Sequence, residues 1–312
     1  MLSRVSDSLY WMSRYLERAE HTARVMNVQL NLMLERGAGS DDRHWARVLR
    51  ELGVELSEDC PPAPVLAQSL IHDNANPSSI VGCIVAAREN ARQVREQISS
   101  EMWEQLNRLF HQVKQDDEVG DVRDFLYAIR DGAHLFQGIT DSTMTHGEGW
   151  QFIQTGRFLE RTVAVAMLVG VHFGEFHANR VLEPEPLEWI GLLQSCTAFE
   201  AYCKAYTADL RPDRIAEFLV LNAIFPHSIR FSADALEASL KQIGMETSKQ
   251  RSARVQRIAG RLQATLAFGQ IDEIMNSGLH SYLDTVRRQC TQVHGALYQT
   301  YINYPVEAAL GA

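Results

Sequence analysis

The apolar positions at the start of the chain follow the spacing of one long amphipathic helix. Residues three or four apart form a single apolar seam over about nine helical turns: Leu2, Val5, Leu9, Met12, Leu16, Ala19, Ala23, Met26, Leu30 and Met33. Gly37 and Gly39 are expected to end this helix, and a short helix is expected from Asp41 to Leu52. The chain therefore begins with elements that predict helix-on-helix packing.

Helical periodicity continues along the rest of the chain. Asn76-Pro77 is interpreted as an N-cap followed by a first-turn proline. Ser100 is expected to cap a further helix, and Gly120-Asp121 is expected to open another. Later helices are expected at about 148–177, 187–206, 212–224, 232–243, 249–275 and 279–303. Because no strand or hairpin signal appears, the sequence predicts an all-α multi-helix bundle of about nine to twelve helices.

One five-residue motif occurs twice. Arg14-Tyr15-Leu16-Glu17-Arg18 recurs 143 residues later as Arg157-Phe158-Leu159-Glu160-Arg161, with the apolar seam in the same register. The shared motif, seam and helix length favour an internal duplication. We therefore expect one helical domain over residues 1–312, built from pseudo-symmetric halves at 1–145 and 146–312, with 183–186 as the best linker candidate.

Composition excludes some classes of function without indicating a reaction. The chain is 46% hydrophobic and 22% charged, as in globular proteins, and its net charge of -9 argues against a nucleic-acid-binding protein. The first residues lack the apolar core of a signal peptide, and the longest apolar run, 163–173, is shorter than the about 20 residues that a bilayer requires. We therefore expect a cytoplasmic protein with neither a nucleic-acid nor a membrane partner.

Signatures of metal and cofactor sites are missing from the sequence. The five cysteines are odd in number and include no Cys-x-x-Cys pair, which favours reduced thiols: Cys60, Cys83, Cys196, Cys203 and Cys290. No zinc-binding His-Glu-x-x-His helix, Gly-rich phosphate loop or Gly-x-Ser-x-Gly turn is present, and His172 and His177 do not share a helix face. We expect no metal and no cofactor.

The two Glu-Arg motifs are the main candidate site. In the first copy, Arg14, Glu17, Arg18 and His21 fall on neighbouring turns of one helix; Glu17 can pair with Arg14, whereas Arg18 points elsewhere and needs another partner. A solvated charged face is the alternative for this copy. The second copy runs directly into the apolar segment 162–169, which predicts a buried helix in which unpaired charges are costly.

If the halves are duplicated, each motif can supply the partner that the other lacks. Across an approximate two-fold axis, we expect Glu17 to meet Arg161 and Glu160 to meet Arg18. These two pairs would form a reciprocal clamp between the motifs, and Arg14 and Arg157 would line it.

A third charged cluster occupies residues 87–96. Arg88 and Arg92 flank an apolar seam, and with Arg95 they form a stripe that could hold a phosphate or a carboxylate. Self-pairing of Glu89 with Arg92, and of Arg92 with Glu96, explains the same pattern, and we favour it. The cluster includes Asn90 and remains a candidate for either a binding or a structural role.

Together these stretches resemble the Alpha-E family, a bacterial helical domain named for its Glu-Arg motif. The resemblance is carried by residues 10–24, 87–96, 103–107, 156–161, 198–202 and 225–231 and covers nearly the whole chain. One departure is that the second motif is followed by apolar residues from Val163, where the family usually has polar ones.

The resemblance implies a biological setting. Relatives are typically encoded beside an ATP-grasp-type ligase and a transglutaminase-like peptidase, which makes those two proteins the expected partners. The expected function is an accessory or co-catalytic subunit of a peptide- or amide-ligation system. Two alternatives stay open: an enzyme that uses Glu17, Glu160 and the arginines on an acidic or amide substrate, and a scaffold that only forms homo-oligomers. The residues alone do not decide whether the protein is an enzyme.

Overall fold

All the regular secondary structure in the described part of the chain is helical, as the sequence predicts. A computed structural model describes residues 1–36, 42–54, 61–73, 76, 78–115, 121–178, 186–207, 209–246 and 249–303. Within these ranges there are fourteen α-helices and no strand, which confirms the all-α multi-helix fold. The number of helices exceeds the expected nine to twelve because one short helix was missed and two expected helices are divided.

The helices divide into six before residue 145 and eight after it. The first group comprises α1 (Ser3–Arg36), α2 (Asp42–Glu51), α3 (Ala63–His72), α4 (Ile80–Gln93), α5 (Ser100–Gln115) and α6 (Val122–Thr143). The second comprises α7 (Glu148–Ala178), α8 (Pro186–Ser195), α9 (Phe199–Tyr206), α10 (Pro212–Leu221), α11 (Ile229–Glu246), α12 (Lys249–Ala267), α13 (Ile271–Ser277) and α14 (Leu279–Leu297). A π-helix, Tyr298–Ile302, continues α14.

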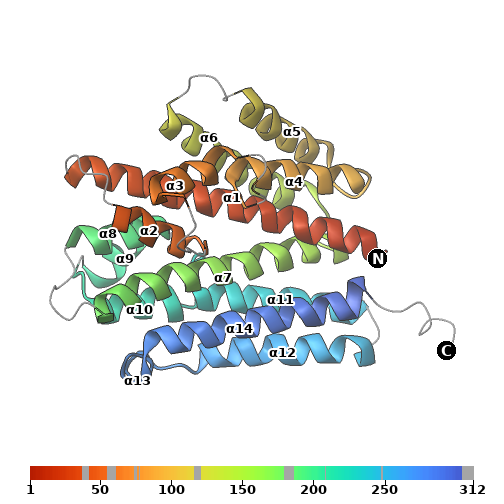
Figure 1. Ribbon diagram of the computed structural model, residues 1–312. Helices are drawn as coiled ribbons and strands as arrows, with labels where there is room; N and C mark the ends of the chain where they lie inside the picture. Colours follow the sequence, from red (N-terminus) through yellow and green to blue (C-terminus); the bar gives the residue numbers. More distant parts are fainter. Residues whose placement is uncertain are drawn as a thin grey trace.

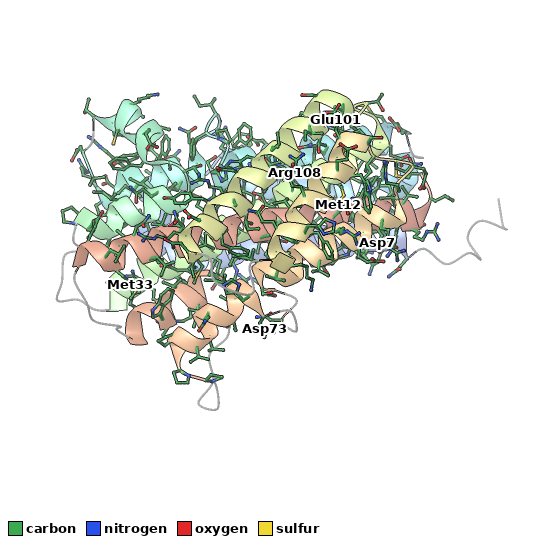
Figure 2. The ribbon with its side chains drawn as sticks, turned by 90° about the horizontal axis from the view of Figure 1, so that it is seen from above. Asp7, Met12, Met33, Asp73, Glu101 and Arg108 are labelled. Atoms are coloured by element: carbon green, nitrogen blue, oxygen red, sulfur yellow. The ribbon has the colours of Figure 1, made fainter. Side chains whose placement is uncertain are left out.

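The two long helices α1 and α7 lie side by side in the centre of the molecule. Figure 1 shows α4, α5 and α6 on the α1 side and α11, α12 and α14 on the α7 side. In Figure 2 the labels of Asp7 and Met33 lie toward opposite ends of the molecule, so α1 runs along its length. The two helices run in the same direction, because the amino group of Met1 lies 2.8 Å from Glu148 at the start of α7.

The backbones of α1 and α7 approach each other closely at Gly156, just before the second Glu-Arg motif. A Cβ atom placed on Gly156 would lie 2.2 Å from Ser13 Oγ and 2.3 Å from the backbone oxygen of Tyr10. Only a residue without a side chain allows the backbones to approach this far. The apolar seam of α7 is buried as expected, at Phe152, Thr155, Leu159, Thr162, Ala166, Val169 and Phe173. The close approach brings the two motifs within reach of each other.

Two expected N-cap residues are wrong, although α5 begins at Ser100. The N-cap of α4 is Ser79, whose hydroxyl accepts a hydrogen bond from the Gly82 amide at 2.9 Å, and not Asn76. At α5 the capping side chain is Ser99, which accepts from the Met102 amide at 3.1 Å, and not Ser100. The expected start at Asp121 is confirmed, because its carboxylate accepts from the Arg123 amide at 2.9 Å.

Two expected helices are each divided. The helix expected at 187–206 is broken between α8 and α9, where Thr197 adopts a positive φ of 52°. Cys196 and Cys203, which the expected helix would have contained, therefore lie on different sides of this break. Among the described cysteines, Cys83, Cys196, Cys203 and Cys290 form no disulfide bond. The helix expected at 249–275 is divided into α12 and α13.

Some predictions lie outside the described residues or remain untested. Gly37, Gly39, Asp41, Cys60, Pro77 and most of the 183–186 linker are not described. Duplication of the halves 1–145 and 146–312 stays a prediction. Among the helices that are described, none combines the length and the apolar character that crossing a membrane requires.

Candidate functional site: the Glu-Arg clamp

A buried ion pair joins Glu17 of α1 to Arg161 of α7. Arg161 donates from Nε to Oε1 of Glu17 at 2.5 Å and from Nη2 to Oε2 at 2.9 Å. The two side chains are only 2% and 3% exposed. Gln137 Nε2 also donates to Glu17 at 3.3 Å, and Arg161 Nη1 donates to the backbone oxygen of Pro226 at 3.1 Å. These added hydrogen bonds help to offset the cost of burying both charges.

Glu160 of α7 is held by two arginines of α1. Arg18 donates from Nε to Oε1 of Glu160 at 2.7 Å, and Arg14 donates from Nε to Oε2 at 2.7 Å. Burial opposes ionisation of Glu160, but the guanidiniums of Arg14 and Arg18 outweigh it and lower the pKa of the carboxyl below its ordinary value. The carboxylate is therefore ionised at neutral pH, and the three groups together carry a net charge of about +1.

These contacts confirm the predicted reciprocal pairing. We call the set the Glu-Arg clamp: Arg14, Glu17, Arg18, Arg157, Glu160 and Arg161. The solvated-face alternative is wrong for the first motif, because α7 covers this face of α1 and leaves Glu17 buried. The pairing of Arg14 with Glu17 within α1 is also wrong, since Arg14 reaches Glu160 on the neighbouring helix.

The two ends of the clamp are unequal. Arg14 bonds directly to Glu160, whereas the matching Arg157 has its Nε 3.9 Å from Glu17. Burial and the neighbouring charge of Arg161 lower the pKa of Arg157. The Glu17 end therefore depends chiefly on Arg161, while the Glu160 end is shared between two cations.

A second charged layer lies one turn further along α1. Glu20 and Arg24 form an ion pair at 3.0 Å and are 1% and 5% exposed. Nη2 of Arg24 lies 3.5 Å from Nδ1 of the candidate residue His21, and Nη1 lies 3.4 Å from Nδ1 of His227. Burial and the charge of Arg24 lower the pKa of His21 to about 4, so its imidazole is neutral at pH 7.

Glu20, Arg24 and His227 were missed as candidates. The i, i+4 spacing of Glu20 and Arg24 was visible in the sequence, but it occurs equally in surface pairs. The approach of His227 depends on how α1 meets the segment before α11. No local pattern indicates that contact.

The third predicted cluster lies on α4 and the segment that follows it, and none of its hydrogen bonds or ion pairs among the described residues joins it to the clamp. Glu89 pairs with Arg92 at 2.6 Å on an exposed face, as the self-paired interpretation predicts. The expected pairing of Arg92 with Glu96 is absent from the ion pairs of the described residues, because α4 ends at Gln93. Arg88 donates to Asn107 at 2.7 Å, and Asn90 donates to the backbone oxygen of Ala86 at 2.8 Å.

Two cavities adjoin the clamp. The smaller, about 20 Å³, is lined by residues that include Glu17, Gln137 and Arg157. The larger, about 300 Å³, is lined by residues that include Arg18 and Glu160. No group of three His, Cys, Asp or Glu side chains that could hold a metal ion occurs in the part of the chain that the structure describes.

Comparisons with known proteins agree with the resemblance in the sequence. An uncharacterized protein of Mycobacterium bovis is 23% identical over 310 residues, which cover 90% of this chain and 34% of that protein. An uncharacterized protein of Mycobacterium tuberculosis is 22% identical with the same coverage, so the chain spans about a third of the length of the curated relatives it matches. No solved structure matches. The Alpha-E family model, described as a predicted alpha-helical domain with a conserved ER motif, matches residues 1–302, and the chain therefore belongs to the Alpha-E family.

Proposed function

We propose that this chain is an accessory or co-catalytic subunit of a bacterial peptide- or amide-ligation system. Its main partner is an ATP-grasp-type ligase, and a transglutaminase-like protein is the second partner. The observation that carries the proposal is that both carboxylates of the clamp are already engaged by arginines. The ligation system and the two partner proteins are proposed from the family resemblance.

The engaged carboxylates favour a supporting role over a catalytic one. A general base needs an accessible carboxylate whose pKa lies near the working pH. Glu160 has two guanidinium partners that lower its pKa, and Glu17 is held at both oxygens by Arg161. Groups held in this way position α1 against α7 and are poor proton acceptors. The clamp therefore supports the accessory role over an enzyme that uses Glu17 or Glu160 as a base.

The length of the relatives also supports a role beside another protein. Because the matched region is 34% of the Mycobacterium bovis protein, most of that protein lies outside the helical domain. A domain that is joined to further chain commonly works together with that chain. This observation favours a partnership over a scaffold that only associates with itself.

Affinity purification from the native host tests the proposal. The chain, tagged at its chromosomal locus and expressed at its native level, is expected to retain an ATP-grasp-type ligase reproducibly, and an untagged strain serves as the control. Reproducible absence of such a ligase would contradict the accessory role. Turnover of an amide substrate by the purified chain alone would favour the stand-alone enzyme instead.

A further inference from the structure

The larger cavity beside the clamp has the size and lining of a small-molecule site. It occupies about 300 Å³ between α1, α2, α3 and α7. Part of its described wall is apolar, formed by Leu52, Leu70, Val163, Ala164 and Met167. Ligand cavities typically combine such a wall with a few polar groups that fix the orientation of the ligand.

One charged wall of this cavity favours an anionic group. Arg18 lines the cavity, and its side chain is 28% exposed. Its Nε is bonded to Glu160, but that single carboxylate is shared with Arg14, so positive charge is in excess here. A guanidinium has five N–H donors in a planar fork that matches a carboxylate. Arg18 can therefore hold Glu160 and still receive a ligand carboxylate.

His21 adds a neutral donor to the same cavity. Its imidazole is 5% exposed, and Nδ1 faces an N–H of Arg24, so Nδ1 accepts and the proton lies on Nε2. This buried Nε2 has no hydrogen-bond partner among the described residues. Buried polar groups rarely stay unpaired in folded proteins. His21 thus supplies an N–H that a ligand oxygen would satisfy.

The cavity also has an acidic wall. Glu51, at the end of α2, lines the cavity and is 1% exposed. Arg47 Nε lies 3.6 Å from Glu51, and the same guanidinium lies 2.9 Å from Glu188. His172 Nδ1 lies 3.5 Å from Glu51. Both carboxylate oxygens of Glu51 are buried without a hydrogen-bond partner among the described residues, and an ammonium group of a ligand would satisfy them.

We propose that this cavity binds a small zwitterion, an α-amino acid or a short peptide. Arg18 and His21 receive the carboxylate, Glu51 receives the ammonium group, and the apolar wall receives the side chain. The assignment does not rest on the proposed ligase partner, because every group belongs to this chain. It can therefore hold even if the affinity purification fails.

Titration calorimetry of the wild-type chain tests the assignment. The probes are leucine, methionine and alanyl-alanine, each compared with its N-acetylated and its C-amidated form. We expect at least one free probe to bind and both capped forms to bind at least about tenfold more weakly, since each loses one charged contact. Equal binding of either capped form would overturn the assignment. So would the absence of binding by all three free probes at about 1 mM.

Two variants locate the bound probe. Glu51→Gln is expected to weaken binding of the free probe by about tenfold. The free probe should then bind no more tightly than its N-acetylated form. Glu101→Gln, at an exposed position on α5 (Figure 2), is the matched control and should bind as the wild type does. Ala164→Leu narrows the cavity and should also weaken binding. Wild-type binding by both cavity variants would place the probe elsewhere and contradict the assignment. If a variant does not fold, the comparison of free and capped probes on the wild-type chain still tests the assignment.

Discussion

At the scale of single residues, burial and a neighbouring cation determine the protonation state of His21. His21 is almost fully enclosed and faces Arg24, and both factors favour its neutral form. In the unfolded chain the same imidazole has an ordinary pKa of about 6.5. Folding therefore releases a proton from His21 at mildly acidic pH, and this makes stability depend on pH.

The sign of this dependence follows from proton binding. Between pH 6.5 and about 4, the unfolded state binds more protons at His21 than the folded state does, so stability decreases as the pH falls through this window. One such group contributes a slope of up to about 1.4 kcal/mol per pH unit. In His21→Gln, urea unfolding measured across this window should show a slope smaller by up to that amount. His111→Gln, an exposed site on α5, controls for the loss of an imidazole as such. Identical slopes for His21→Gln and the wild type would show that His21 is not held neutral.

Glu160 provides a second test at this scale. Glu160→Gln keeps the shape of the side chain but leaves Arg14 and Arg18 without their shared carboxylate. Removing one partner of a buried ion pair typically costs about 3–5 kcal/mol, and we expect a loss of this order in the free energy of unfolding by urea. Glu89→Gln removes a carboxylate from an exposed pair with Arg92 and should change stability little. Similar losses of unfolding free energy in the two variants would mean that the clamp contributes no more to stability than a surface pair does.

At the scale of elements, the register of α1 against α7 depends on one close contact. The backbones meet where Gly156 faces Ser13 and Tyr10, and the following turns bring the motifs together. Two helices that run in the same direction keep equivalent positions of the two motifs at similar heights. This geometry explains why Glu17 and Glu160 find partners on the opposite helix.

Gly156→Ala is expected to disturb this contact. The new methyl group would lie 2.3 Å from a backbone oxygen, which cannot move without shifting α1. Overpacking of this kind typically costs about 1–3 kcal/mol in unfolding free energy. Gly138→Ala is the matched control, because α6 leaves open space there and alanine favours the helix by about 0.5–1 kcal/mol. Thermal unfolding of both variants should shift in opposite directions. A stabilising Gly156→Ala would contradict the close packing.

The sequence predicts most elements but not all their ends. The three–four spacing of apolar residues was enough to place α1 and α7, because burial of one face is a strong and periodic constraint. The break at Thr197 has no glycine or proline to mark it and depends on the packing of α8 and α9. Asn76 and Ser79 are both good N-caps, and only the backbone decides which one is used.

The clamp was predictable for a different reason. The two motifs are identical at their charged positions, and adjacent Glu and Arg residues on one helix cannot face each other. Because of this constraint, the adjacent Glu and Arg side chains of each motif needed partners on another element. The cavity walls were not predictable, because Glu51 and Met167 come from helices α2 and α7, whose apposition no local pattern indicates.

At the scale of the whole molecule, the clamp lies between two groups of helices. α1 packs against α4 and α6, and α7 packs against α11 and α14. Figure 1 shows that the contact of α1 with α7 runs between these groups. The pair of Glu17 with Arg161 crosses this contact with both side chains buried, so its strength bears on how firmly the two groups are held together.

A double-mutant cycle between Glu17→Ala and Arg161→Ala tests this account most directly. Urea unfolding of the wild type, both single variants and the double variant gives the coupling energy of the pair. We expect each single variant to lose about 3–5 kcal/mol, and the double variant to lose less than the sum, with a coupling of about 1–3 kcal/mol. The same cycle at Glu89 and Arg92 supplies the exposed reference, where little coupling is expected. Strictly additive losses at Glu17 and Arg161, or single variants as stable as the wild type, would contradict a clamp between the two motifs.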